Sequence, residues 1–211
     1  PESFDDFLEG PCERASDALE SLTVDDDLEA LLSAFKKRKL GLCFVRGKVR
    51  DEMATSLLSL NDVLRLYDTK RISSRLEVED VASKISSMPE ATPIREALPV
   101  MFQLRHRTVF LSEKRRYVSD RSVIDRVFSP DSLERLRERS KDGVLDASIG
   151  SLQQLAPTEV APTTGLQAAA AQIKSDRGPC LTIQGAELLV TAWDIVMKPW
   201  DAGRLSIGQR T

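Results

Sequence analysis

Hydrophobic and polar positions repeat one pattern three times along the chain. Each copy has a short apolar run, a helix with one apolar face, two strand-like runs joined by a turn, and a second helix. In the first copy the acidic run 25–27 precedes apolar residues at helical spacing, which predicts a helix start there. Strands are expected at 42–45 and 55–58, with the polar stretch 46–52 as a long hairpin loop.

The second and third copies begin near residues 81 and 152. Their strand pairs are expected at 108–111 with 117–118, and at 180–183 with 188–190. A Ser or Thr follows the return strand in every copy, where its side chain suits a helix N-cap; these residues are Ser59, Ser119 and Thr191. Pro99 is expected to kink the helix of the second copy or to delay its start. Cys43 and Cys180 fall at one repeat position, which predicts small buried side chains.

The repeat predicts an α/β protein of three β-α-β-β-α units. A Ser-Pro-Asp-Ser start signal at 129–132 adds a connecting helix between the second and third units. The expected division is an N-terminal segment 1–14, a first unit 15–68, a second unit 69–128 that pairs with the first, a linker helix 129–143, a third unit 144–198 and a C-terminal tail 199–211.

Composition excludes several function classes. The chain has 211 residues and a formal net charge of −3, which argues against a general nucleic-acid binder. No apolar run approaches the roughly 20 residues that span a bilayer, so we expect no membrane association. The three cysteines, Cys12, Cys43 and Cys180, lack the spacing of a zinc site or a disulfide framework. They indicate reduced thiols and a cytoplasmic location.

Catalytic constellations are also missing from the sequence. The one histidine, His106, lies between two arginines that would lower its pKa and make it a poor base. Nucleophile-elbow, Walker and dinucleotide-binding motifs do not occur. We therefore expect no enzyme, no catalytic residue, no metal ligand and no required cofactor.

With these residues in view, the chain resembles the cystathionine-β-synthase-type (CBS) domain family, whose β-α-β-β-α units pair into Bateman modules. The resemblance rests on a hydrophobic strand followed by Ser/Thr-x-x-Asp at the second helix start. That motif occurs at 57–62 and 189–194, while the second copy has Ser122 in place of the aspartate. The resemblance to the family extends from about residue 15 to residue 198.

The resemblance implies an adenosine-type ligand, such as AMP, ADP, ATP or S-adenosylmethionine, bound between paired units. Asp62 and Asp194 would then accept hydrogen bonds from ribose hydroxyls, and Ser59 and Thr191 would face a phosphate. The resemblance further implies base-flanking residues on the strands and phosphate-binding arginines on the second copy. These are Thr23, Val24, Val45, Ile183, Arg105 and Arg107.

Two functions remain open at this point. The chain is expected to be a regulatory sensor that binds the ligand, or a ligand-free scaffold of CBS-like units that binds a protein partner. Ser59-x-x-Asp62 is equally an ordinary helix cap, so the exposure of Asp62 and Asp194 discriminates the two. If units work in pairs, a third unit leaves an apolar face unpaired, which predicts a homodimer.

Overall fold

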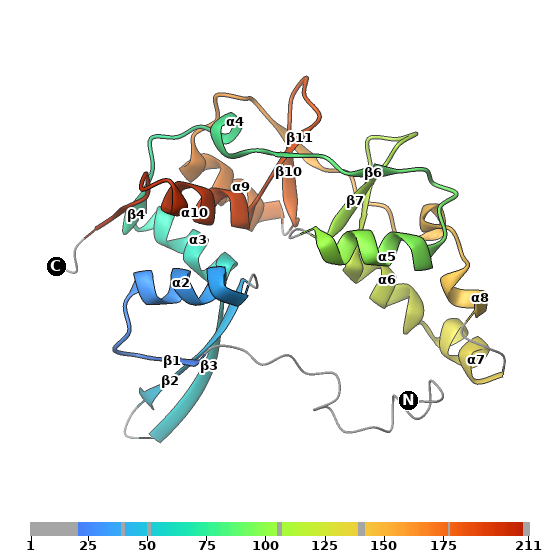
Figure 1. Ribbon diagram of the computed structural model, residues 1–211, viewed down its shortest axis with the longest axis horizontal. Coiled ribbons are helices and arrows are strands. Elements are labelled where there is room, and N and C mark those ends of the chain that lie inside the picture. Colours follow the sequence, from blue (N-terminus) through green and yellow to red (C-terminus); the bar gives the residue numbers. More distant parts are fainter. Residues whose placement is uncertain are drawn as a thin grey trace. The chain divides into compact units, whose positions relative to one another are not determined.

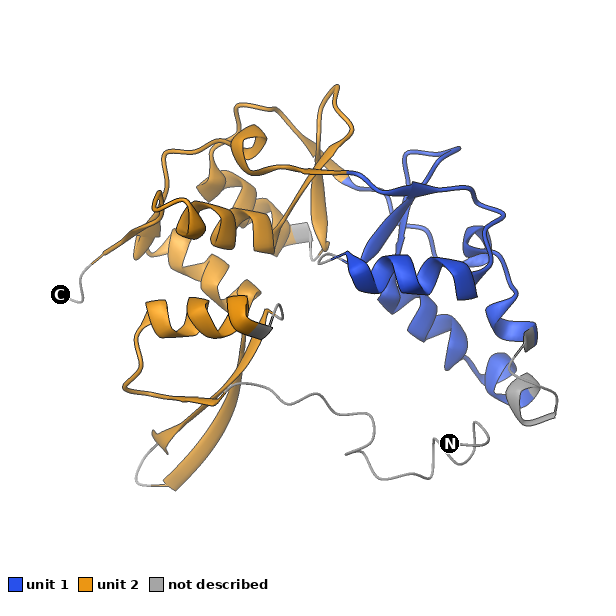
Figure 2. Cartoon of the chain, in the orientation of Figure 1, with its two compact units in different colours: residues 1–17, 85–157 blue, residues 18–84, 158–211 orange. Residues whose placement is uncertain are grey.

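The computed structural model describes residues 21–38, 41–49, 52–104, 107–138, 142–176 and 178–208. The chain forms two compact units (Figure 2), one containing residues 85–157 and the other residues 18–84 together with 158–211. Helices alternate with small sheets in both units, so the predicted α/β class is confirmed.

The first copy builds a three-stranded sheet in the order β1-β2-β3. Strand β1 runs parallel to β2, and β2 runs antiparallel to β3. The elements are β1 (Ser21–Thr23), α2 (Leu28–Arg38), β2 (Leu42–Val49), β3 (Glu52–Ser59) and α3 (Leu60–Asp68). The expectation of a loop at 46–52 is wrong, because β2 runs on to Val49 and β3 begins at Glu52. Arg46 and Lys48 are exposed, so polar residues there mark the solvent face of a strand.

The same element order recurs twice more (Figure 1). The next stretch contains β6 (Ser87–Met88), α5 (Ile94–Gln103), β7 (Thr108–Leu111), β8 (Tyr117–Ser119) and α6 (Asp120–Val127). The last contains β9 (Thr158–Val160), α9 (Leu166–Asp176), β10 (Cys180–Ile183), β11 (Leu188–Thr191) and α10 (Ala192–Asp201). Pro99 lies inside α5, which already begins at Ile94, so the expectation of a later start is wrong.

Short elements fill the segments between the copies. Helices α7 (Pro130–Glu138) and α8 (Asp142–Leu145) occupy the stretch expected to be a linker helix. The others are β4 (Ile72–Ser73), α4 (Val78–Val81), β5 (Ser83–Lys84), the 3-10 helix η2 (Ile149–Ser151) and β12 (Ser206–Ile207).

The connectors that lead into the second and third copies are exchanged. Strand β5, which precedes the second copy, extends the sheet of the third copy in the order β5-β11-β10-β9. Leu155, which precedes the third copy, forms a bridge with Tyr117 in the second. The exchange therefore completes each sheet with residues from the other copy's connector.

Backbone hydrogen bonds repeat this exchange just before the first helix of the second copy and of the third copy. The Val78 amide donates to the Thr164 carbonyl at 2.9 Å, and the Ile149 amide donates to the Thr92 carbonyl at 2.8 Å. Val78 and Ile149 are both fully buried. The two connectors, whose sequences are unrelated, thus make equivalent contacts, each with the residue two positions before a helix start.

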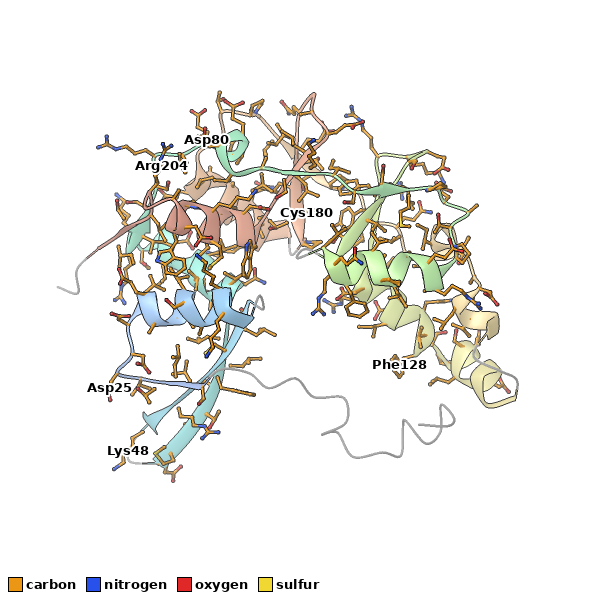
Figure 3. The ribbon with its side chains drawn as sticks, in the orientation of Figure 1. Asp25, Lys48, Asp80, Phe128, Cys180 and Arg204 are labelled. Atoms are coloured by element: carbon orange, nitrogen blue, oxygen red, sulfur yellow. The ribbon has the colours of Figure 1, made fainter. Side chains whose placement is uncertain are left out.

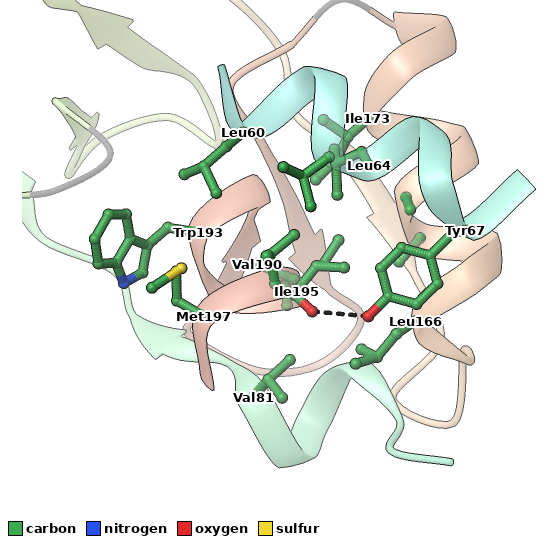
Figure 4. Packing of buried hydrophobic residues seen from close by; sticks show 14 of the residues in the cluster. Leu60, Leu64, Tyr67, Val81, Leu166, Ile173, Val190, Trp193, Ile195 and Met197 are labelled. Atoms are coloured by element: carbon green, nitrogen blue, oxygen red, sulfur yellow. Dashed lines mark hydrogen bonds between the residues drawn. The ribbon is translucent and has the colours of Figure 1, made fainter. Parts of the chain in front are cut away.

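The helices of the first copy pack against those of the third. Leu64 and Tyr67 of α3 share one core with Ile173 of α9 and Ile195 of α10 (Figure 4). The small residues Ala169 and Ala170 line the same core, and small side chains allow helices to approach closely. This arrangement differs from the expected pairing of the first copy with the second. Periodicity identifies the apolar face of a helix but not the helix that covers it.

The exposed side of the first copy's sheet, which also carries Arg46 and Lys48, contains a group of apolar side chains. Phe44 and Leu57, which lie opposite each other on β2 and β3, are 38% and 53% exposed. Leu42 and Met53 extend the exposed set. The corresponding pair in the second copy, Phe110 and Tyr117, is buried. We call Leu42, Phe44, Met53 and Leu57 the open sheet face.

Candidate functional site

The first turn of helix α3 carries a carboxylate, that of Asp62, in which one oxygen is firmly hydrogen-bonded and the other is not. Ser59 is the last residue of β3, and its amide and hydroxyl donate to Oδ2 of Asp62 at 2.9 and 2.7 Å. The other oxygen, Oδ1, lies 3.6 Å from Arg65, and the Asp62 side chain is 36% exposed. Exposed ion pairs of this kind stabilise proteins weakly, so Oδ1 can exchange this partner for another donor.

The equivalent aspartate of the third copy is saturated. Thr191 donates from its amide and its hydroxyl to Oδ2 of Asp194 at 2.9 and 2.7 Å. Oδ1 accepts from the Ser83 hydroxyl at 2.8 Å and pairs with the Lys198 ammonium at 2.9 Å. Asp194 is buried. A ribose could reach this carboxylate only by displacing these donors.

Lys198 ties the exchanged connector to helix α10. Besides Asp194, its ammonium donates to the carbonyls of Val81 and Ala82 at 2.5 and 2.9 Å and to the Ser83 hydroxyl at 2.9 Å. One cation therefore holds the segment that leads into β5. The sequence contains a signal for half of this cluster, because Lys198 is four residues after Asp194. Ser83 lies 111 positions away and has no such signal.

The second copy has no carboxylate at this position. Ser119 and Ser122 exchange hydrogen bonds between amide and hydroxyl, both at 3.4 Å, and both residues are buried. The substitution read from the sequence thus leaves a neutral helix cap that offers a ribose no charged acceptor.

Strand register separates Thr23 and Val24 from the start of α3. Ser59 lies opposite Leu42, whereas Thr23 lies beside Arg46, four residues further along β2. At the usual strand rise this separation is about 13 Å. Thr23 also donates from its amide and hydroxyl to Oδ2 of Asp26, which lowers the pKa of that carboxyl. Thr23 and Val24 therefore serve the turn before α2 and lie away from Ser59.

Val45 and Ile183 occupy matching positions on the middle strands. Val45 lies opposite Ser56, three residues from Leu42, and Ile183 lies beside Val160 at the turn end of β10. Val45 is half-buried and Ile183 is buried. Neither is placed at the strand end that carries Ser59 or Thr191.

The predicted phosphate-binding arginines belong to the loop before β7. Arg105 lies outside the described residues. Arg107 has a positive φ of 48°. Its guanidinium lies 3.4 Å from the Asp120 carboxylate and 5.4 Å from the Phe102 ring centroid. Arg107 is thus engaged within its own unit.

The two described cysteines are buried thiols. Burial, and secondarily the nearby Asp194 carboxylate, raise the pKa of the Cys180 thiol to about 12. Cys180 is labelled in Figure 3. The repeat positions of Cys43 and Cys180 differ by one, contrary to expectation, because Cys180 lies opposite Thr191 while Leu42 lies opposite Ser59. All four residues of β10 are buried, so burial alone does not distinguish the two registers.

Two further features bear on function. Among the described residues, no group of three or more His, Cys, Asp or Glu side chains is arranged to hold a metal ion. The helices in this part of the chain are too short or too polar to cross a bilayer.

Comparisons with known proteins identify the fold. Neither the protein-family models nor the curated proteins contain a match. Among solved structures, a Methanocaldococcus jannaschii protein proposed to be an archaeal homologue of g-AMPK matches with a TM-score of 0.77 and 13% identity, over 94% of this chain and 73% of its own. An uncharacterised conserved protein from Pyrococcus horikoshii matches with a TM-score of 0.59 and 13% identity, over 85% and 78%. A CBS domain-containing protein from Kribbella flavida also matches, with a TM-score of 0.44 and 14% identity, over 57% and 95%.

Proposed function

We propose that this chain, which has the fold of CBS-domain proteins, is a non-catalytic regulatory module that binds an adenosine-type ligand at the start of helix α3. The proposal rests on the hydrogen bonding and exposure of the Asp62 carboxylate. Its Oδ2 is fixed by Ser59 and its Oδ1 has one weak, exposed partner. A carboxylate held in this way can accept from the two adjacent hydroxyls of a ribose without losing its helix cap.

The proposal assigns one ligand site where the resemblance implies two. Asp194 has four donors around it and is buried, so a ligand there would first have to break the Ser83 and Lys198 contacts. The equivalent of Lys198 in the first copy is Leu66, which supplies no cation. Without a lysine at this position, and without a connector hydroxyl like that of Ser83, Oδ1 of Asp62 keeps Arg65 as its partner.

Regulation would follow from linkage. A ligand that contacts Ser59 and Asp62 holds the junction between β3 and α3, and α3 packs directly on α9 and α10. The ligand therefore favours the conformation in which these helices are packed, by its differential affinity for it. A protein partner that recognises this conformation would read the ligand's presence.

A homodimer is the second part of the proposal. Phe44 and Leu57 of the open sheet face repeat positions that are buried in the second copy, which supports an apolar contact at this face. A second copy of the chain offers the same face about a twofold axis.

Because both described cysteines are buried thiols, we place the protein in a reducing, cytoplasmic environment.

An assembly scaffold that binds a protein partner is the second candidate function. It is favoured by the saturated carboxylate of Asp194, which acts as a helix cap and connector anchor. The two candidates predict different consequences of substituting Asp62.

The test is thermal unfolding of the full chain with AMP, ADP, ATP, S-adenosylmethionine and a GTP control. A ligand at 100 times its dissociation constant stabilises the folded state by about 2.7 kcal/mol. Asp62→Asn keeps the shape of the side chain but removes its charge, so it should abolish the shift caused by the adenosine-type ligand. Asp131→Asn, also a first-turn acid but on α7, is the matched control and should retain the shift.

Two outcomes would overturn the ligand proposal. If no ligand shifts the transition at millimolar concentration, the scaffold function is favoured. If Asp62→Asn retains the full shift, the ligand binds elsewhere in the chain.

A further inference from the structure

A cavity whose chemistry differs from that of the Asp62 site lies beyond the other end of α3. It has a volume of about 670 Å³, and its walls come from the segment after α3 and the segment after α10. The lining residues are Ser73, Ser74, Arg75, Leu76, Arg204 and Ser206. The pairing of β4 with β12, in which Ser73 lies opposite Ser206, brings the two segments together.

The lining is rich in hydrogen-bond donors and contains no carboxylate. Within the described part of the chain, neither Arg75 nor Arg204 (labelled in Figure 3) forms an ion pair. The Ser74 hydroxyl oxygen accepts from the Leu76 amide at 3.3 Å, which leaves its proton available to donate. Two guanidinium groups and three hydroxyls around one cavity create a strongly positive, polar environment.

Two acids on the segments that supply the lining residues already have hydrogen-bond or ion-pair partners. Asp201 pairs with Lys36 at 2.8 Å, and Oδ2 of Asp80 accepts from the Glu77 amide at 2.9 Å. Lys36 and Lys174 of the same unit, by contrast, have carboxylate partners, Asp201 and Asp68. The positive charge of Arg75 and Arg204 therefore has no partner within the described residues.

We propose that this cavity binds the phosphate group of a small phosphorylated molecule. Each guanidinium presents paired N–H donors that match the oxygens of a phosphate, and the serine hydroxyls can complete its coordination. Leu76 supplies the one apolar surface, which suits the carbon skeleton that carries the phosphate.

A phosphate bound in the cavity would stabilise the pairing of two short strands, β4 and β12. Strands β4 and β12 have two residues each, and an isolated pair of this length is marginal in water. A phosphate that contacts Arg75 on one segment and Arg204 on the other adds a bridge that the strands lack. The bound anion therefore stabilises the docking of β12 and the Gly208 amide, which donates to the Arg71 carbonyl at 2.8 Å.

This cavity is separate from the Asp62 site. Helix α3 has nine residues and spans about 13 Å, with Asp62 in its first turn and β4 beyond its last. Its ligand chemistry is also opposite, because the Asp62 site offers an acceptor and this cavity offers donors. The proposal therefore stands independently of the ligand proposed for α3.

Equilibrium dialysis of the full chain with inorganic phosphate tests the proposal at low ionic strength. Saturable binding of one phosphate is expected. Arg75→Gln and Arg204→Gln should each weaken it at least about tenfold, and Arg121→Gln, an exposed arginine on α6, should leave it unchanged. Phosphate should also slow hydrogen exchange at the amides of Ile72 and Gly208. Circular dichroism of each variant shows whether it is folded.

Further arms of this experiment identify the source of the phosphate. If AMP displaces phosphate and adenosine does not, the cavity takes a nucleotide phosphate; if neither displaces it, the cavity takes a different phosphorylated molecule. Asp62→Asn should leave phosphate binding unchanged, which separates this site from the one at α3. Absence of saturable binding, or equal binding by the Arg75→Gln/Arg204→Gln double variant, would overturn the proposal.

Discussion

The ammonium of Lys198 lies 2.9 Å from the carboxylate of Asp194, one turn earlier on helix α10. This ion pair occupies Oδ1 of Asp194. The same ammonium also donates to the connector that leads into β5. At the matching place in the first copy, Asp62 is followed by Leu66 and remains partly exposed. Two copies of one motif thus have different roles because Lys198 and the connector's Ser83 both engage Asp194.

Replacing Lys198 with methionine tests its role as an anchor. Lys198→Met leaves the Asp194 charge buried with one cation fewer and removes two backbone contacts of the connector. We expect a loss of about 2 kcal/mol in the free energy of unfolding, measured by urea denaturation. Lys36→Met breaks an exposed ion pair at 2.8 Å and should cost less than about 1 kcal/mol. Equal losses in the two variants would contradict the anchor.

Tyr67 tests the packing of the first copy on the third. Its buried hydroxyl donates to the Ile195 carbonyl at 3.0 Å. Tyr67→Phe keeps the ring in the core and removes only this bond, so it should cost about 1 kcal/mol. Leu64→Ala, in the same core, should cost about 2–5 kcal/mol because it leaves a cavity. If neither variant lowers the urea midpoint, α3 does not pack on the third copy's helices.

The thiol of Cys180 makes stability depend on alkaline pH. Burial raises its pKa in the folded state from 9.0 to about 12, so the unfolded chain loses this proton first as pH rises. The protonated thiol's contribution to the free energy of unfolding is therefore present in full below pH 9. It is lost between about pH 9 and 12, at about 1.4 kcal/mol per pH unit.

Urea denaturation of the wild type and of Cys180→Ala between pH 8 and 10.5 measures this effect. The alanine variant should lose less stability over the range, whatever its stability at neutral pH. Burial also raises the pKa of Tyr67, which adds a loss of the same sign at higher pH in both proteins. A wild type and a variant with the same slope would show that Cys180 ionises normally in the folded chain.

Local signals in the sequence were sufficient for the elements and their caps. Thr108–Leu111 and Ser119 were predictable because an apolar run followed by a serine specifies a strand end and a helix start without distant residues. The charge of Lys48 and its polar neighbours favours a loop, whereas the structure places Lys48 on a strand. Ser83 beside Asp194 could not be predicted, since nothing local marks a connector that joins another copy's sheet.

The open sheet face yields the last prediction. If two chains meet through this face, a charge placed at its centre must be buried in an apolar contact, which is costly. Leu57→Glu should therefore weaken dimerisation by about a hundredfold or more, measured by analytical ultracentrifugation across micromolar concentrations. Ile124→Glu is the matched control, because Ile124 on α6 is 52% exposed and Leu57 is 53% exposed. The control should leave the dimer intact and so show that an added charge alone does not dissociate it. A wild type that sediments as a monomer, or a Leu57→Glu variant that stays dimeric, would mean that the open sheet face does not join two copies.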